Sequence, residues 1–162
     1  MASHIKYISN KIIQDGFWLV ATLSLFALVI AYSSELLLGL RPCILCIYQR
    51  IPYALMLLFS IITILRPTWV KISRPLIVIL AIIEIAFALY HVGIERHIFE
   101  ENHICQDNQQ IGNLLSTTKL MSSCSNIAFK FMNFSMAEWN AIYAIGLLYY
   151  FIKREKNHDA TR

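Results

Sequence analysis

The chain has 162 residues, of which 57% are hydrophobic and only 15% are charged, and its formal net charge is +4. Such a composition argues against an ordinary soluble domain, in which about half of the residues are apolar and about a quarter are charged. The basic residues form no single patch, so the positive charge does not indicate a partner nucleic acid. The length fits one domain, and we expect residues 1–162 to form a single membrane domain.

Apolar runs, taken in chain order, predict four membrane spans, because crossing a bilayer requires about 20 mostly apolar residues. We expect the spans at about residues 17–40, 43–65, 75–92 and 136–152, the last being near the lower limit of length. The first run is longer than the apolar part of a signal peptide, roughly 7–15 residues, so we expect it to be retained. The predicted fold is an all-α bundle of four transmembrane helices. A soluble helical bundle and a cleaved first segment are the alternatives.

The distribution of lysine and arginine predicts the orientation, because these residues resist translocation across the membrane. They concentrate before the first span, between the second and third spans, and after the fourth span. The residues concerned are Lys6, Lys11, Arg66, Lys71, Arg74, Lys153, Arg154, Lys156 and Arg162. Both termini are therefore expected in the cytoplasm. The short turn around Arg41 and the long loop 93–135 are expected on the other side.

This orientation places all four cysteines, Cys43, Cys46, Cys105 and Cys124, on the outer side or at its rim. Disulfides form and persist in such oxidising compartments, whereas cytosolic thiols stay reduced. An even number of cysteines there predicts two bridges, for which three pairings are possible.

Cys43 and Cys46 follow Pro42 directly. Proline is favoured in the first turn of a helix, so we expect both cysteines in the first turns of the second span. Partial positive charge at a helix N-terminus favours a thiolate. At about 100° per residue, Arg50 shares one helix face with the two cysteines. An arginine at that depth should stabilise a thiolate or an anionic cofactor oxygen; the alternatives are snorkelling to the rim or an ion pair with Glu35.

A bridge between Cys43 and Cys46 would close a very short loop and stabilise the fold little, which favours a redox role for this pair. Cys105 and Cys124 lie in the long loop, and a bridge between them would staple that loop. The spacing of apolar residues within 111–121 suggests a short amphipathic helix on the membrane surface between them. One pair in a loop and one pair above an arginine are typical of a relay that works by thiol–disulfide exchange.

The segment Pro42–Arg50, with the sequence PCILCIYQR, closely resembles the signature of the DsbB family of disulfide bond formation proteins. Two further blocks, Tyr90–Glu95 and Ser135–Asn140, are similar to other parts of that family. Gln49 stands where the family frequently has an acid, and Glu138 stands where it often has a small residue. The resemblance implies a multi-pass protein of the bacterial inner membrane. It would reoxidise a soluble periplasmic thiol oxidase of thioredoxin fold, DsbA, and would pass the electrons to the membrane quinone pool.

The resemblance also implies roles for individual residues. Cys105 would form the mixed disulfide with the partner protein, and Cys124 would be its bridge mate. The electrons would pass to Cys43 and Cys46, of which Cys46 would face ubiquinone (or menaquinone). Arg50 would stabilise the developing quinone oxyanion. The chain would thus be a protein-dithiol:quinone oxidoreductase with its active cysteines on the periplasmic side.

Other polar residues have competing interpretations. His91, at the outer end of the third span, could bind a quinone carbonyl or pass a proton, although an interfacial histidine is often without function. Glu84, within the third span, is expected to have a hydrogen-bonded structural role. His97 and His103 lie near Cys105, but no pair has the usual spacing of a zinc site, so no metal is expected. Two other functions stay open: a membrane protein with purely structural disulfides, and a metal-binding membrane protein.

Overall fold

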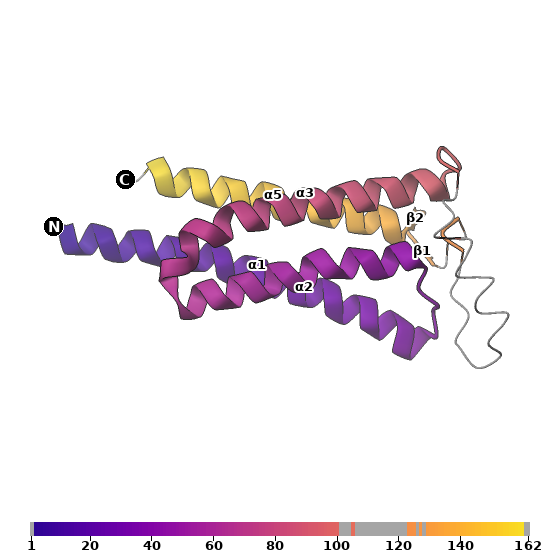
Figure 1. The fold of residues 1–162 in the computed structure, drawn as a ribbon, viewed down its shortest axis with the longest axis horizontal. Helices are drawn as coiled ribbons and strands as arrows, with labels where there is room; N and C mark the ends of the chain where they lie inside the picture. The colour runs from indigo at the N-terminus through magenta and orange to yellow at the C-terminus, as the bar shows by residue number, and fades with distance from the viewer. Residues whose placement is uncertain (1, 101–104, 106–122, 126, 128, 161–162) are drawn as a thin grey trace.

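The computed structural model describes residues 2–100, 105, 123–125, 127 and 129–160, with only the backbone for 2–14 and 157–160. Four long helices dominate it (Figure 1). They are α1 (Ala2–Leu38), α2 (Ile44–Leu65), α3 (Val70–Glu95) and α5 (Met136–Ala160). A 3₁₀ turn, η1 (Pro67–Trp69), precedes α3, and a two-stranded hairpin of β1 (Lys130–Phe131) and β2 (Phe134–Ser135) precedes α5.

The helices form a closed ring in which α1 and α3 each contact both α2 and α5. The first turns of α1 and the last turns of α5 lie at one end of the bundle, and the hairpin lies at the other end (Figure 1). We call that second end the cysteine end, since α2 begins there directly after Cys43. The all-α bundle predicted from the sequence is thus confirmed as a fold.

The helices are longer than the predicted spans. Helix α1 begins at Ala2 rather than near residue 17, α3 begins at Val70 rather than at Pro75, and α5 extends to Ala160. Hydropathy marks only the apolar part of each helix, whereas the backbone hydrogen bonds continue through polar residues at its ends. Gly39 stops α1, because it adopts φ +64°, a left-handed conformation that glycine tolerates without a steric cost.

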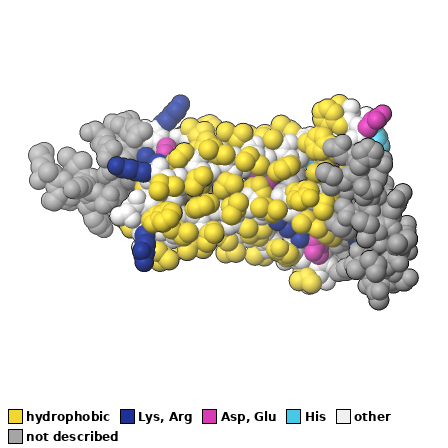
Figure 2. All heavy atoms as spheres, in the orientation of Figure 1, with side chains coloured by type: hydrophobic (Ala, Val, Ile, Leu, Met, Phe, Trp, Pro, Cys, Tyr) yellow, Lys and Arg dark blue, Asp and Glu magenta, His cyan; other side chains and the backbone are white. Residues whose placement is uncertain are grey.

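Three helical segments among the described residues are long and apolar enough to cross a membrane. They are Asp15–Leu38, Ile44–Leu65 and Pro67–Glu95. On the face shown in Figure 2, hydrophobic side chains cover the middle of the molecule, while lysine and arginine side chains gather at the end that holds the termini. The fourth predicted span, 136–152, corresponds to α5, and that it crosses the membrane stays a prediction.

The core of the bundle is apolar, but a polar group is buried beside it. The buried side chains of the apolar core are Phe17, Val20, Tyr53, Met56, Ile77, Ala81, Leu147 and Phe151. Glu84 is 0% exposed, and its Oε1 accepts a hydrogen bond of 2.7 Å from the Asn140 amide. Tyr53 donates its hydroxyl to Asn140 Oδ1 at 2.9 Å. This network joins α2, α3 and α5, in agreement with the structural role expected for Glu84.

Candidate functional site

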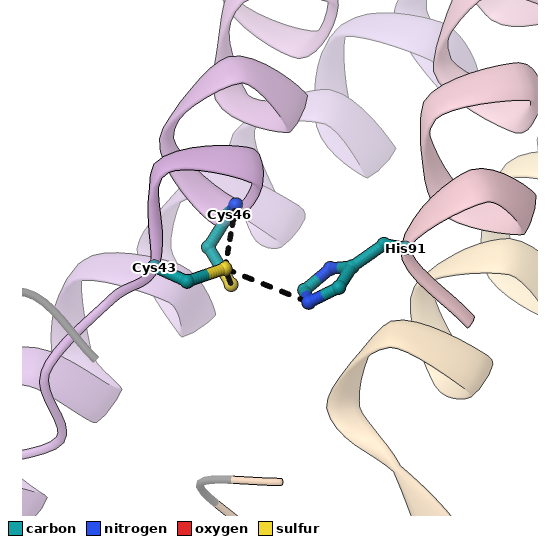
Figure 3. A group of neighbouring side chains, drawn as sticks. All are labelled: Cys43, Cys46 and His91. Atoms are coloured by element: carbon teal, nitrogen blue, oxygen red, sulfur yellow. Dashed lines mark hydrogen bonds between the residues drawn. The ribbon is translucent and has the colours of Figure 1, made fainter. Parts of the chain in front are cut away.

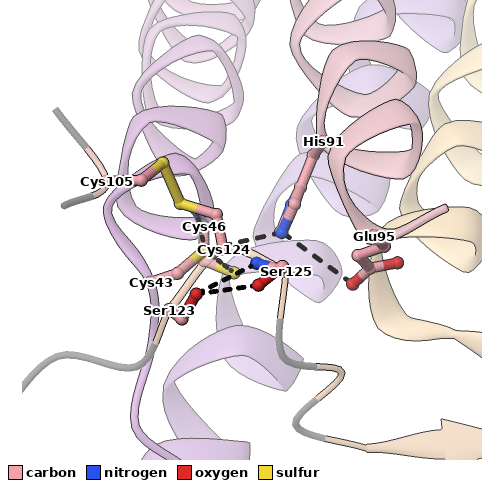
Figure 4. The surroundings of a disulfide bond; sticks show 8 residues. All are labelled: Cys43, Cys46, His91, Glu95, Cys105, Ser123, Cys124 and Ser125. Atoms are coloured by element: carbon pink, nitrogen blue, oxygen red, sulfur yellow. Dashed lines mark hydrogen bonds and ion pairs between the residues drawn. A yellow bond between two sulfur atoms is a disulfide. The ribbon is translucent and has the colours of Figure 1, made fainter. Parts of the chain in front are cut away.

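The two cysteine pairs meet in one buried cluster at the cysteine end. Cys43, Cys105 and Cys124 pack there with Leu45 and Ile94, and none of the five is more than 7% exposed. Cys105 and Cys124 form a disulfide with a Cα–Cα distance of 6.0 Å. Of the three possible pairings, the structure therefore contains the one that the family resemblance implied. Figure 4 shows this disulfide above the first turn of α2.

Cys43 and Cys46 are both free thiols, so the second predicted bridge is absent from this structure. Helix α2 begins at Ile44, and Cys43 is its N-cap, with Sγ accepting the Cys46 N–H at 3.3 Å. Pro42 lies two residues before the helix rather than in its first turn, but Cys43 at the cap and Cys46 in the first turn stand where the sequence predicted them. The sulfur of Cys43 satisfies one of the backbone donors that a helix start leaves open.

The thiol of Cys43 also donates to Cys46 Sγ, with 3.1 Å between the two sulfurs. This hydrogen bond raises the pKa of the Cys43 thiol, and burial raises it further by disfavouring the charged form. The sulfur that receives the hydrogen bond is Cys46, which is also the less buried of the two. The arrangement therefore favours negative charge on Cys46 rather than on Cys43.

His91, near the end of α3, points toward the two sulfurs (Figure 3). Its Nε2 lies 3.5 Å from Cys43 Sγ and 3.8 Å from Glu95 Oε1, which is one helical turn further along. The exposed fractions of the His91 and Glu95 side chains are only 5% and 8%. Sequence reasoning named His91 but missed Glu95. The i, i+4 spacing of the two residues on one helix was the signal that could have found it.

Glu95 is held by the start of α5. Ser135 Oγ donates to Glu95 and accepts the backbone N–H of Glu138 at 3.1 Å, while the Ser135 N–H donates to Glu138 Oε2 at 2.8 Å. This reciprocal pair is a capping box, which satisfies two open donors of the helix start. Arg96 Nε donates to Glu138 at 3.0 Å. Glu138 stands where the family that the sequence resembles often has a small residue, and these contacts give the acid a structural explanation.

Arg50 lies one turn deeper in α2 than Cys46. Its guanidinium forms an ion pair with Glu35 of α1 and lies 4.7 Å from the ring centroid of Tyr32. The side chains of Arg50 and Glu35 are 13% and 20% exposed, so the pair is largely removed from solvent. The ion pair that the sequence offered as an alternative is therefore present. It does not block the cysteine face, because Arg50 and both cysteines line one cavity.

That cavity has a volume of about 540 Å³ and lies at the cysteine end, walled by α1, α2, α3, the hairpin and α5. Cys43, Cys46, Arg50 and His91 all contribute to its wall, as the shared helix face of the first three predicted. Apolar and aromatic side chains supply much of the remaining lining, among them Phe26, Ile30, Phe129, Phe131, Trp139, Ile142 and Tyr143. The site thus combines a dithiol, a cation and an imidazole with an apolar chamber.

Two predictions about the loop lie beyond what the structure describes. The amphipathic helix expected within 111–121 falls outside the described residues, and so does His103. The described residues do include the turn at the end of α3. Gly93 O accepts the N–H groups of Ile98 and Phe99, and the Phe99 ring occupies the space where a side chain at position 93 would lie. This turn ends α3.

Comparison with known proteins agrees with this geometry. The model of the family described as disulfide bond formation protein DsbB matches residues 14–153. An uncharacterized protein, RP370, of Rickettsia prowazekii (strain Madrid E) is 29% identical over 152 residues, covering 89% of this chain and 88% of the relative. A disulfide bond formation protein B of Histophilus somni (strain 129Pt) is 27% identical over 127 residues, or 71% of each chain. No solved structure matches.

Proposed function

Since this chain belongs to the DsbB family of disulfide bond formation proteins, we propose that it reoxidises a soluble periplasmic protein of thioredoxin fold and passes the electrons to a membrane quinone. Family membership and the apolar helices make it a multi-pass membrane oxidoreductase that forms disulfide bonds. The observation that carries the finer proposal is the shared cavity, in which a dithiol, Arg50 and His91 face one apolar space next to the loop disulfide.

The residues present fit a quinone. A quinone headgroup is a flat ring with two carbonyl oxygens, and the cavity offers aromatic walls, a guanidinium and an imidazole. Arg50 would hold one oxygen, and His91 would hold the other or exchange a proton with it. The quinone would supply the capacity to accept two electrons. Ubiquinone and menaquinone share this chemistry.

The two cysteine pairs would divide the reaction. A thiolate of the partner attacks Cys105, the Cys105–Cys124 bond breaks, and a mixed disulfide forms. The partner's second thiol then closes its own disulfide and releases Cys105 as a thiol. The reduced loop pair next exchanges with an oxidised Cys43–Cys46 pair, and the packing of the two pairs in one buried cluster supports this step.

We further propose the orientation that the basic residues predict, with both termini in the cytoplasm and the cysteine end in the periplasm of a bacterial inner membrane. A membrane-impermeant thiol reagent applied to reduced intact spheroplasts tests it. The reagent should label Cys105 and Cys124 without detergent. Labelling only after lysis would contradict this orientation.

A coupled assay tests the reaction itself. The full chain is purified in detergent and mixed with a reduced thioredoxin-fold dithiol protein and a short-chain ubiquinone, whose absorbance is followed. One quinone should be reduced for each disulfide formed in the partner. No quinone reduction would overturn the proposal. Purely structural bridges would instead stay inert to the dithiol, which thiol trapping of Cys105 and Cys124 detects.

A further inference from the structure

Three side chains that commonly bind metal ions converge at the wall of the cavity. The Sγ atoms of Cys43 and Cys46 and a ring nitrogen of His91 all lie within 4.8 Å of one another. Within this group the two sulfurs are 3.1 Å apart, and Cys43 Sγ is 3.5 Å from His91 Nε2. Figure 3 shows the imidazole, carried by α3, pointing at both sulfurs at the start of α2. The sequence predicted His91 at the same quinone site as the two cysteines, but it did not predict the three side chains as a group of metal donors.

The spacing is close to what a tetrahedral zinc ion requires. Zinc bonds of about 2.3 Å to sulfur and about 2.0 Å to nitrogen place neighbouring donor atoms roughly 3.3 to 3.8 Å apart. The sulfur–nitrogen distance already lies in that range. The two sulfurs would need to separate by about 0.7 Å to reach the edge of such a tetrahedron. Cys46 Sγ and the His91 nitrogen, which lie within 4.8 Å of each other, would move closer on binding.

A carboxylate lies beside this group of three donors. Glu95 Oε1 is 3.8 Å from His91 Nε2, the same nitrogen that faces Cys43. The orientation of the carboxylate is fixed, because its other oxygen, Oε2, accepts a hydrogen bond from the hydroxyl of Ser135. Two thiolates and a carboxylate crowded in a buried site would be costly without a compensating cation. A divalent ion offsets that cost, and the adjoining cavity gives it a route to the sulfurs.

We propose that the dithiol form of this site binds Zn²⁺ through Cys43, Cys46 and His91, with Glu95 beside His91 as a neighbouring negative charge. Binding deprotonates the two thiols and releases two protons, and no electrons move. The disulfide form has no thiolate to offer, so binding depends on the redox state of the pair. The ion would hold the pair as a dithiolate and so inhibit electron transfer, a consequence that rests on the proposed function, whereas binding itself does not.

Metal binding is tested without quinone. The double variant Cys105→Ser/Cys124→Ser removes the loop thiols, so that only this site can offer thiolates. After reduction it should bind one Zn²⁺ per chain in competition with a chromophoric chelator, and Co²⁺ should give a thiolate-to-cobalt charge-transfer band. After oxidation of Cys43 and Cys46 to a disulfide, both signals should be lost. No binding by the reduced chain, or equal binding by both forms, would overturn the proposal.

Variants in this background assign the ligands. Cys46→Ser and His91→Ala each remove a ligand and should weaken Zn²⁺ binding by about a hundredfold or more. Glu95→Gln removes only a neighbouring charge and should weaken it by about 10-fold. His97→Asn is the matched control, because His97 is an exposed histidine just beyond the same helix, and asparagine accepts its positive φ of 56°. A variant that still binds Co²⁺ but has an altered charge-transfer band has lost a ligand and has kept its fold. Unchanged affinity in His91→Ala would contradict the proposed ligand set.

Inhibition is measured separately in the coupled assay. Zn²⁺ should slow oxidation of the dithiol partner, and added quinone should relieve that inhibition, because quinone removes the dithiol form that binds the ion. If Zn²⁺ binds but the wild type never reduces quinone, the proposed function fails and the metal site stands. If turnover is normal and Zn²⁺ neither binds nor inhibits, only the metal site fails.

Discussion

The two cysteine pairs share one cluster but have different surroundings. Cys105 and Cys124 are already joined, come from the long loop, and pack mainly against Leu45 and Ile94. Cys43 and Cys46 are free, begin a helix, and contribute to the wall of a cavity that also contains Arg50 and His91. The difference is the basis of the proposed division, in which the loop pair reacts with a partner protein and the other pair exchanges electrons with a small apolar molecule.

The largest expected effect separates the two pairs directly. Cys105→Ser should reduce oxidation of the thioredoxin-fold partner to the uncatalysed background, because no loop disulfide is left to form the mixed disulfide. Quinone reduction driven by a small dithiol such as dithiothreitol should persist in this variant. Cys46→Ser is the matched comparison, and it should abolish quinone reduction by either donor. Equal loss of both activities in Cys105→Ser would contradict separate roles for the two cysteine pairs.

A variant of Arg50 tests whether quinone reduction by Cys43 and Cys46, which we call the helix pair, depends on a nearby cation. Arg50→Met should slow quinone reduction by about 10²- to 10³-fold, as expected when a donor to a developing oxyanion is removed. The Cys105–Cys124 bridge should still form. Stopped-flow absorbance of quinone measures the rate, and thiol trapping reports the bridge.

The ion pair with Glu35 provides the control for that prediction. Glu35→Gln removes the carboxylate charge but keeps the guanidinium, so it should affect quinone reduction much less than Arg50→Met does. A double-mutant cycle separates the two effects. Equal rate losses in both single variants would indicate that Arg50 serves only its ion pair.

Away from the cysteines, Glu84 should matter for stability rather than for turnover. Glu84→Leu leaves the Asn140 amide without its acceptor and should lower the free energy of unfolding by about 0.6–1.7 kcal/mol, from the average to the largest value for interhelical hydrogen bonds in a membrane protein. Glu84→Gln preserves an acceptor oxygen and should cost less. Thermal unfolding in detergent measures both. A large loss of quinone reduction in a stably folded Glu84→Gln would contradict the structural role.

The smallest effect concerns the start of α5. Glu138→Ala removes one half of the capping box and the contact with Arg96, and should cost about 0.5–1 kcal/mol of stability. Because Ser135 also holds Glu95, affinity for Zn²⁺ should fall slightly as well. Glu155→Ala, at the opposite end of α5, is a useful comparison for a carboxylate in an ion pair. A stability loss in Glu138→Ala no larger than in Glu155→Ala would argue against the capping role.

Much of this organisation could be predicted from the sequence. Apolar runs located three of the helices that are fit to span a membrane, and helical periodicity placed Cys43, Cys46 and Arg50 on one face. Both inferences work because they use only local repeats of the chain. The start of α2 was predicted to within one residue, although the sequence does not reveal that a cysteine sulfur supplies the cap.

Contacts between helices were harder to predict. The approach of His91 to Cys43, the hydrogen bond of Ser135 to Glu95, and the network around Asn140 each join different helices. Such contacts depend on how the helices rotate and pack, which hydropathy and spacing do not determine. Glu35 was an exception, because its depth in the first span matched that of Arg50 in the second.

The most direct test isolates the helix pair from the loop pair. Cys105→Ser/Cys124→Ser protein is fully reduced, freed of reductant and metal ions, and mixed once with excess short-chain ubiquinone. The account predicts that each chain reduces one quinone and that alkylation then finds Cys43 and Cys46 joined as a disulfide, two electrons and two protons having left the thiols. If both thiols stay free and the quinone absorbance is unchanged, Cys43 and Cys46 are not the pair that reacts with quinone.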